Sequence, residues 1–411
     1  MSGDRLVVDR DFHAGMLGYL ARLGPSVGCL VPEVPMLSAF SDLEPLELPI
    51  AEIPYAVRTL DGRWNRDPLP SVRVQLHKHL ADAELVVGAQ GSGIPRAIFD
   101  AATRRGLPVV PIVETNRRVA LDRARRSVWN PLRGLVRLSR ARAEWRVVTD
   151  QVRRATAVQC NGYLAYFGFE GLNERRLLYL DSRLHQHQVL DAERIAQRVQ
   201  SLATPRPLEL LFVGPFERVY GPLEIVRVGI ELHRRGVPFR LRMLGCGGHR
   251  RRMRRIIRRN GAARSIQLAE VTDSATLAQA YAETDLLLSC QPREDTVCEY
   301  IEAMGRGVPV LGFNTSTWRA VANASGAGII VPVGAVGAAA RELIELAGDT
   351  ERLLALSLSA RRFAAEHSFE EEWRKRCDHL AAFYHRAEPL TTAASTAAGG
   401  SEWVSLEPAP P

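Results

Sequence analysis

Short apolar runs alternate with amphipathic segments along most of the chain. In the first half, the runs that predict strands cover residues 6–8, 27–31, 84–88 and 109–113. Apolar positions at helical spacing predict helices over residues 16–23 and about 95–105. Strands that alternate with helices in this way favour a parallel sheet with helices on both faces.

The same pattern starts again after a linker at 186–207, which holds a helix and a Thr-Pro-Arg-Pro connection. Further strands are predicted at 208–213, 239–244, 286–288 and 308–313. Further helices are predicted at 223–235, 275–282, 338–347, 351–366 and 370–384. The chain is therefore expected to form two doubly wound α/β domains, 1–185 and 208–366, which face each other across a cleft. Ligands of such sheets bind beyond the carboxyl ends of the strands.

Charge and cysteine content limit the partners and the cellular compartment that we expect for this protein. The 411 residues carry a formal net charge of +8, almost entirely from arginine, because Lys78 and Lys375 are the only lysines. A basic surface favours anionic partners, but the arginine-rich segments lack the aromatic stacking pattern of a nucleic-acid platform. The six cysteines form no CxxC pair, and neither an apolar run of bilayer length nor a secretory signal pattern is present. We therefore expect a cytoplasmic protein that binds no nucleic acid.

The segment 293–310 carries the most specific chemical signal. Thr296 followed by Glu299 is a capping box, which predicts that a helix begins at Thr296. The free N–H groups of its first turn suit an anion, and a phosphate in particular. Glu294 precedes this helix and Glu302 lies inside it, where a carboxylate can accept two hydrogen bonds from vicinal hydroxyls of a sugar.

The spacing of Glu294 and Glu302 resembles the E-x7-E pattern of family 4 glycosyltransferases, which are retaining enzymes with the GT-B fold. The run Glu302-Ala303-Met304-Gly305-Arg306-Gly307-Val308-Pro309-Val310 is similar to a run that follows this pattern in the family. Upstream, Gly214 to Gly221 and Gly245 to Gly248 stand where the family has two glycine-containing loops. The likeness covers about residues 155–385 and is strongest to a bacterial subgroup that resembles enzymes of polysaccharide biosynthesis.

The resemblance implies roles for individual residues. Glu294 would contact the donor sugar as a catalytic residue, and Asp295 is a rival for that role. The donor-binding residues that it implies are Gly214, Thr296, Val297 and Glu302, the last on the nucleotide ribose. It also implies that a closing helix, at 367–386, crosses back to the first domain. Residues 387–411, rich in small and polar residues, predict a disordered tail.

One departure from the family concerns the diphosphate. The family places an arginine after the first glycine of its diphosphate loop and a lysine before the last, where this chain has Pro215 and Tyr220. Those charges neutralise the leaving diphosphate in the transition state. Arg218 lies in the same loop and is the candidate catalytic residue that replaces them.

The acceptor side carries weaker signals. His13 follows the first predicted strand and either faces the cleft or is an ordinary surface histidine. Gly91 and Ser92 precede a predicted helix and either hold an acceptor phosphate or form a plain tight turn. The long basic segment Arg117–Arg146, which Pro131 kinks or divides, is either a peripheral membrane contact or a solvated face. The arginine cluster 250–255 is expected to be a solvated face.

These observations favour one function over two rivals. The favoured function moves a hexose from a nucleotide-sugar to a carbohydrate or lipid-linked acceptor with retention, with no cofactor and no bound metal. The first rival is a catalytically degenerate binding or scaffolding protein, which Pro215 and Tyr220 favour. The second rival, a polyanion-binding protein, is favoured only by charge. If the arginine segment binds lipid, the protein would lie on the inner face of the plasma membrane.

Overall fold

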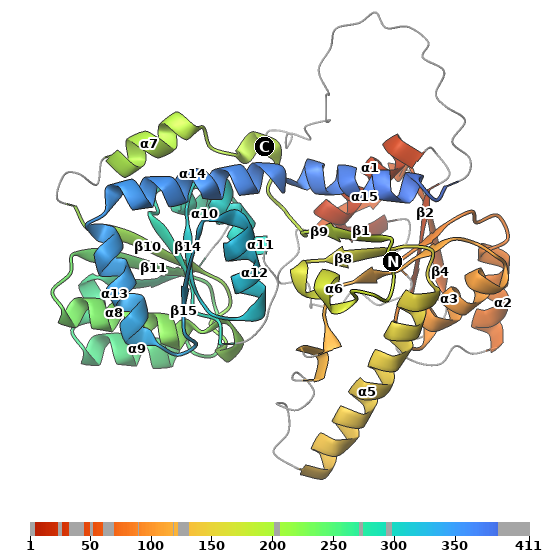
Figure 1. Cartoon of the computed structure of the whole chain (residues 1–411), viewed down its shortest axis with the longest axis horizontal. Helices are drawn as coiled ribbons and strands as arrows, with labels where there is room; N and C mark the ends of the chain where they lie inside the picture. The colour runs from red at the N-terminus through yellow and green to blue at the C-terminus, as the bar shows by residue number, and fades with distance from the viewer. Residues whose placement is uncertain are drawn as a thin grey trace, which may run out of the picture.

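A computed structural model of the chain describes residues 5–23, 27–32, 45–49, 52–60, 70–88, 90–117, 119–121, 131–200, 206–270, 274–292 and 298–384. Figure 1 shows two α/β lobes side by side, with α14 (Thr350–Glu366) and α15 (Phe369–Ala381) running along one side of both. The predicted helix that crosses back to the first domain is thus confirmed as α15. The predicted tail at 387–411 lies outside the described residues.

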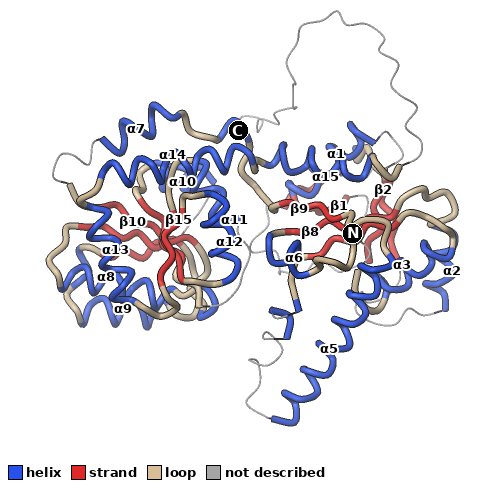
Figure 2. Tube along the Cα trace, viewed as in Figure 1, coloured by secondary structure: helices blue, strands red, loops and turns tan. Residues whose placement is uncertain are grey.

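The C-terminal lobe is built on a six-stranded sheet in the order β12-β11-β10-β13-β14-β15, and every pair in it is parallel. Its strands, which form the red centre of that lobe in Figure 2, are β10 (Leu208–Val213), β11 (Phe239–Leu244), β12 (Ile266–Ala269), β13 (Leu286–Ser289), β14 (Val310–Phe313) and β15 (Gly328–Val331). The predicted second parallel sheet is confirmed, although β12 and β15 were not predicted. Because all strands are parallel, their carboxyl ends share one edge.

Helices cover both faces of this sheet. They are α7 (Ala192–Gln200), α8 (Pro222–Arg234), α9 (Arg250–Arg259), α10 (Ser274–Ala282), α11 (Cys298–Gly305), α12 (Ser316–Ser325) and α13 (Val336–Ala347). Two clusters of buried apolar side chains fill the lobe. One contains Ile225 of α8 and Leu343 of α13, and the other contains Ile301 of α11 and Phe363 of α14. Burial of these apolar stripes holds the helices on the sheet.

The N-terminal lobe consists of shorter strand sets. The strands are β1 (Arg5–Asp9), β2 (Gly28–Pro32), β3 (Pro45–Pro49), β4 (Ala56–Leu60), β5 (Val86–Val87), β6 (Val109–Val110), β7 (Ile112–Val113), β8 (Val158–Asn161) and β9 (Arg176–Tyr179). β2 pairs with β4, β5 with β6, and β7 with β8 and β9, all in parallel. β1 pairs antiparallel with β3, which the alternation of strands and helices did not predict. The strand predicted at 109–113 is split at Pro111, which has no N–H to donate to a ladder.

The helices of this lobe are α1 (Arg10–Leu23), α2 (Pro70–His79), α3 (Ile94–Arg104), α5 (Pro131–Arg154) and α6 (Tyr163–Gly168). Helix α1 begins six residues before the predicted start at 16. The earlier start was not predicted because Gly15, a weak helix former, interrupts the helical pattern. A Cβ atom at Gly15 would lie 2.0 Å from the Trp373 ring, so glycine lets α1 approach α15. Helix α5 begins at Pro131, projects away from its lobe and ends eight residues beyond Arg146 (Figure 1).

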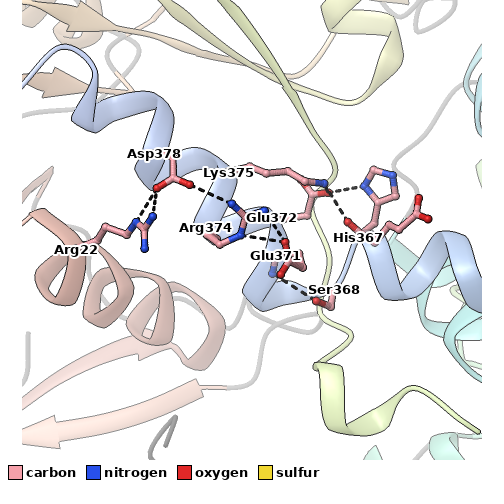
Figure 3. Close-up of polar contacts among 9 residues, drawn as sticks. Arg22, His367, Ser368, Glu371, Glu372, Arg374, Lys375 and Asp378 are labelled. Carbon is pink, nitrogen blue, oxygen red and sulfur yellow. Dashed lines mark hydrogen bonds and ion pairs between the residues drawn. The ribbon is translucent and has the colours of Figure 1, made fainter. Parts of the chain in front are cut away.

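Helix α15 is tied to the rest of the molecule by a network of charges (Figure 3). Arg22 of α1 pairs with Asp378. The carboxylate of Glu372, with 3% of its side chain exposed, accepts hydrogen bonds from Lys375 Nζ at 3.0 Å and from the Leu180 backbone N–H at 3.0 Å. It also pairs with the imidazole of His367. A buried carboxylate is tolerated here because each of these groups satisfies it.

Ser368 marks the turn between α14 and α15, and its hydroxyl accepts a hydrogen bond from the backbone N–H of Glu371 at 3.4 Å (Figure 3). We predict that Ser368→Ala lowers the free energy of unfolding by about 1 kcal/mol, because an N-terminal cap is lost. Thermal unfolding of the full chain measures this. Ser359→Ala, inside α14, is the control and should leave stability equal or slightly higher, since alanine is the better helix former. Equal effects of the two changes would contradict the capping role.

Candidate functional site

Two glycine loops meet at the carboxyl edge of the C-terminal sheet. The first runs from Gly214, directly after β10, to Gly221, directly before α8. Gly221 has φ +69°, and a Cβ atom there would lie 2.0 Å from the carbonyl oxygen of Cys290 at the end of β13. Only glycine fits a position that combines a left-handed conformation with so close a backbone approach. The loop therefore reaches from the end of β10 to the end of β13.

The second loop, Gly245 to Gly248, follows β11 and is bonded to the first. The Phe216 N–H donates to the carbonyl of Cys246 at 2.6 Å, and the His249 N–H donates to the carbonyl of Phe216 at 3.0 Å. A Cβ atom at Gly245, which has φ +154°, would lie 2.0 Å from the carbonyl oxygen of Gly214. Because each of the strands β10 and β11 is followed by a glycine, the two loops can approach closely. Their backbones form one continuous surface at this edge of the sheet.

This surface also holds a carboxylate that the sequence did not predict. The exposed Glu217 accepts a hydrogen bond through Oε1 from the Gly248 N–H at 2.8 Å. A backbone N–H near the start of a helix, here α9, is a favourable place for an anion. The protein thus supplies its own anion at the junction of the two loops. The two residues are 31 positions apart, so no local pattern announces the contact.

The three loop positions that the sequence singled out differ in their surroundings. Arg218 lies in the short 3-10 helix η4 (Arg218–Tyr220), is exposed, and makes no ion pair within the described part of the chain. Tyr220 packs against the apolar core of the lobe, and Pro215 is half-buried. Arg218 is therefore a cation of this loop that can turn toward a ligand.

Helix α11 carries Glu302 and is fixed to the end of β13. The hydroxyl groups of Ser289 and Tyr300 are hydrogen bonded at 2.8 Å, and the Tyr300 ring packs edge-on against Trp318 at 5.0 Å. Glu302 is half-buried. Burial raises the pKa of the Tyr281 hydroxyl, and the charges of Glu302 and Glu299 raise it further. Tyr281 therefore stays neutral beside the carboxylates of α11.

Arg306 stabilises the same helix face. Its Nη1 donates to the carbonyl of Glu302 at 3.1 Å, and its guanidinium lies over the ring of Tyr281 at 5.7 Å. Burial lowers the pKa of Arg306, while the charge of Glu302 partly offsets this. The guanidinium of Arg306 therefore places a cation near the carboxylate of Glu302.

The glycines of the run 302–310 pack against the linker 186–207 and the residues just before it. A Cβ atom at Gly305 would lie 2.3 Å from the side chain of Leu184, and one at Gly307 would lie 2.4 Å from Ile195. Arg198 of α7 donates to the carbonyl of Gly307 at 2.6 Å. These glycines therefore connect α11 to the linker rather than touching a ligand.

Four residues of the sequence-predicted site are not placed. Glu294, Asp295, Thr296 and Val297 lie outside the described residues, and α11 is described from Cys298 onward. Their roles stay predictions. Gly214, Arg218 and Glu302 belong to elements that follow β10 and β13, which are neighbours in the sheet.

His13 lies in the N-terminal lobe and is buried in α1. Its Nδ1 lies 3.0 Å from the Tyr55 hydroxyl, and burial lowers the pKa of the imidazole. The alternative of an ordinary surface histidine is wrong, because 8% of His13 is exposed. A neutral imidazole hydrogen bonded to Tyr55 explains why a histidine is tolerated there.

Gly91 and Ser92 precede α3, and both of their N–H groups are engaged by α5. The Gly91 N–H donates to Gln151 Oε1 and the Ser92 N–H donates to Glu144 Oε1, each at 2.8 Å. A phosphate at this turn would have to replace the carboxylate of Glu144. These contacts join residues 52 and 60 positions apart, so the sequence pattern gave no sign of them.

Two classes of feature are not found in the described part of the chain. No group of three or more His, Cys, Asp or Glu residues there is arranged to hold a metal ion. None of the helices described is both long enough and apolar enough to span a bilayer.

Comparison with protein families and known structures adds to this geometry. Residues 193–363 match the model of the family Glycosyl transferases group 1. This match spans the two glycine loops, α11 and most of α14. None of the curated proteins compared with the chain matches it.

Solved structures show the fold of most of the chain. Anabaena HepE in complex with UDP is similar at 13% identity, with 90% of this chain and 96% of that chain covered and a TM-score of 0.65. A glycosyltransferase of Rickettsia africae aligns at 13% identity over 92% and 95% of the two chains, with a TM-score of 0.60. WaaG, a glycosyltransferase involved in lipopolysaccharide biosynthesis, aligns at 15% identity over 90% and 94%, with a TM-score of 0.57. The chain therefore has the GT-B fold, as the sequence predicted.

Proposed function

We propose that the protein is a retaining hexosyltransferase that takes its sugar from a nucleotide-sugar donor, similar to glycosyltransferase family 4. The observation that carries the proposal is that Glu302 lies on α11, the helix after β13, and that the glycine loop after β10 reaches the end of the same strand. The loop offers backbone N–H groups to a diphosphate, and Glu302 offers two oxygens to the vicinal hydroxyls of a ribose. Solved structures of Anabaena HepE, which has the same fold, hold UDP or UDP-glucose.

In this scheme the transfer depends on how the protein positions donor and acceptor, and no side chain of the protein acts as the base. The donor phosphate accepts the proton of the acceptor hydroxyl on the face from which the leaving diphosphate departs, so the configuration at the anomeric carbon is kept. The protein holds donor and acceptor in reacting geometry and neutralises the charge that develops on the diphosphate. Arg218 is the candidate for that neutralisation, with Glu294 or Asp295 on the donor sugar. No metal or cofactor is required by this scheme.

The acceptor that we favour is a carbohydrate or a lipid-linked saccharide. Helix α5 supports a peripheral membrane contact because it projects from the N-terminal lobe and exposes 64% of Leu135 and 50% of Val136 beside exposed arginines (Figure 1). Basic helices with exposed apolar residues bind at membrane interfaces. Replacing both residues with serine should weaken binding to anionic vesicles, and unchanged binding would favour a soluble acceptor.

One observation favours a second candidate, a donor-binding protein without activity. The loop that would hold the diphosphate has Pro215 and Tyr220 at the positions of the family's two cations, and it carries the additional carboxylate of Glu217. A negative charge at this place repels a diphosphate. The two candidates differ in turnover and agree on binding.

Thermal unfolding with a panel of nucleotide-sugars, followed by assays of donor hydrolysis and transfer with the best ligand, tests the proposal. Stabilisation with turnover supports the transferase, because a bound ligand stabilises the native state by mass action. Stabilisation without hydrolysis or transfer supports the inactive binding protein. No stabilisation by any member of the panel would contradict both.

Glu217→Gln provides a separate prediction about the donor charge. Glutamine can still accept the Gly248 hydrogen bond, but it removes a negative charge that would lie within a few ångströms of the diphosphate. Affinity for UDP should rise about fivefold, which is the effect of ~1 kcal/mol of like-charge repulsion in water. Titration calorimetry at low salt measures this. Glu231→Gln, on the outer face of α8, is the control and should change nothing.

A further inference from the structure

Helix α9 and the short helix η5 (Ala262–Arg264) form a strongly basic surface on the C-terminal lobe. Residues 250–264 include eight arginines and no acidic residue. Seven of these arginines are exposed, and we name them the α9 arginines: Arg251, Arg252, Arg254, Arg255, Arg258, Arg259 and Arg264. The eighth, Arg250, is paired with Glu270 at 3.0 Å.

The α9 arginines have no acidic partner within the part of the chain that the structure describes. Other arginines of the same lobe do have one. Arg227 pairs with Glu224 at 3.3 Å, and similar pairs are Arg235–Glu231 at 2.8 Å, Arg240–Glu209 at 3.0 Å, Arg242–Glu283 at 2.8 Å and Arg352–Glu342 at 2.9 Å. A high arginine content therefore does not by itself explain why the α9 arginines are unpaired.

The folded state gains nothing from this concentration of charge. Like charges four positions apart, such as Arg251 with Arg255 and Arg254 with Arg258, destabilise a helix. Arginines in the first turn of α9, which contains no acidic residue, also oppose the positive end of the helix dipole. What holds the helix is the burial of Met253 and Ile257 on its inner face. The outer face is therefore suited to a partner that brings negative charge.

Five of the α9 arginines line a hollow on this face. A surface hollow of about 330 Å³ is lined by Arg251, Arg254, Arg255, Arg258 and Arg259. These positions follow the helical repeat and share one side of α9. The planar fork of a guanidinium binds a phosphate through two parallel hydrogen bonds. None of the apolar residues of α9 is exposed, so binding would depend on charge rather than on insertion.

We propose that the α9 arginines dock the C-terminal lobe on an anionic lipid bilayer, in addition to any contact made by α5. Clusters of four to eight arginines on a helix are typical of binding to anionic lipid head groups. In Figure 1, α9 and the projecting end of α5 lie on the side of the molecule away from α14 and α15, one in each lobe. A bilayer is an extended flat partner, which can contact basic helices of both lobes at once. The proposal requires neither a donor nor catalytic activity.

Co-sedimentation of the full chain with vesicles tests this docking. The vesicles contain phosphatidylglycerol in phosphatidylcholine, and pure phosphatidylcholine vesicles serve as the neutral arm. The parent should bind the anionic vesicles at low salt and dissociate as salt rises, because screening weakens exposed charges. The variant R251Q/R254Q/R255Q/R258Q should bind more than about tenfold more weakly, given the contribution of each arginine near such a surface. The matching variant R251K/R254K/R255K/R258K should retain most of the binding, which distinguishes charge from packing.

The control variant R227Q/R235Q/R240Q/R352Q removes the same charge from paired arginines and should bind within about twofold of the parent. Circular dichroism verifies that each variant is folded. Equal loss in the α9 variant and the control would show that only net charge matters, and would overturn the proposal. Absence of parent binding at low salt would also overturn it. Binding to heparin without binding to vesicles would overturn it in favour of a soluble polyanion.

Discussion

Arg218→Ala is expected to lower the turnover of nucleotide-sugar by about a hundredfold or more. Arg218 is an exposed cation on the loop between Gly214 and Gly221, and the two positions that are cationic in family 4 glycosyltransferases hold Pro215 and Tyr220 here. Loss of a group that stabilises transition-state charge has an effect of this size. Initial rates of donor hydrolysis and of transfer, measured at saturating donor, provide the test.

Two further variants make this test specific. Tyr220→Lys returns the missing charge to the loop and should maintain or raise turnover. Arg227→Ala removes an exposed arginine from α8, where it pairs with Glu224, and should leave turnover unchanged. If turnover in Arg218→Ala is as high as in the parent and in Arg227→Ala, Arg218 does not replace the missing cations.

Glu302→Ala is expected to weaken nucleotide-sugar binding by about 1.5–3 kcal/mol, the usual scale for hydrogen bonds to a charged group. The carboxylate lies half-buried on α11, next to Arg306 and Tyr281, which hold the helix face in place. Titration calorimetry of the folded variant measures the affinity directly.

Two comparisons separate binding from folding. Glu302→Gln keeps one acceptor oxygen and should lose less affinity than Glu302→Ala. Glu345→Ala, at an exposed position of α13, should bind like the parent. Affinity that is equal in Glu302→Ala and the parent would remove Glu302 from the site.

Much of the C-terminal lobe could be predicted from sequence because its central strands are continuous apolar runs that the fold buries. β10, β13 and β14 lie at the centre of the sheet, and each was predicted. β12 and β15 are the two edge strands and were not predicted: Gln267 interrupts the apolar residues of β12, and β15 lies in a stretch rich in glycine and alanine. The antiparallel direction of β1 relative to β3 could not be predicted because alternation does not fix strand direction.

The candidate site could likewise be predicted from the sequence only in part. Glycines that follow strands and a carboxylate on a helix are local patterns, so Gly214 and Glu302 could be proposed from sequence. Contacts between distant residues could not, because no spacing announces them. Glu217 bonds to Gly248 across 31 positions, and Gln151 and Glu144 of α5 fill the turn at Gly91 and Ser92. These contacts decide which backbone N–H groups a ligand finds unoccupied.

The structure of the protein crystallised with the nucleotide-sugar that stabilises it most tests the central claim most directly. The account predicts that the diphosphate lies over the loops Gly214–Gly221 and Gly245–Gly248, with the ribose hydroxyls bonded to Glu302. A nucleotide bound elsewhere, such as over the turn at Gly91 and Ser92 in the N-terminal lobe, would contradict it.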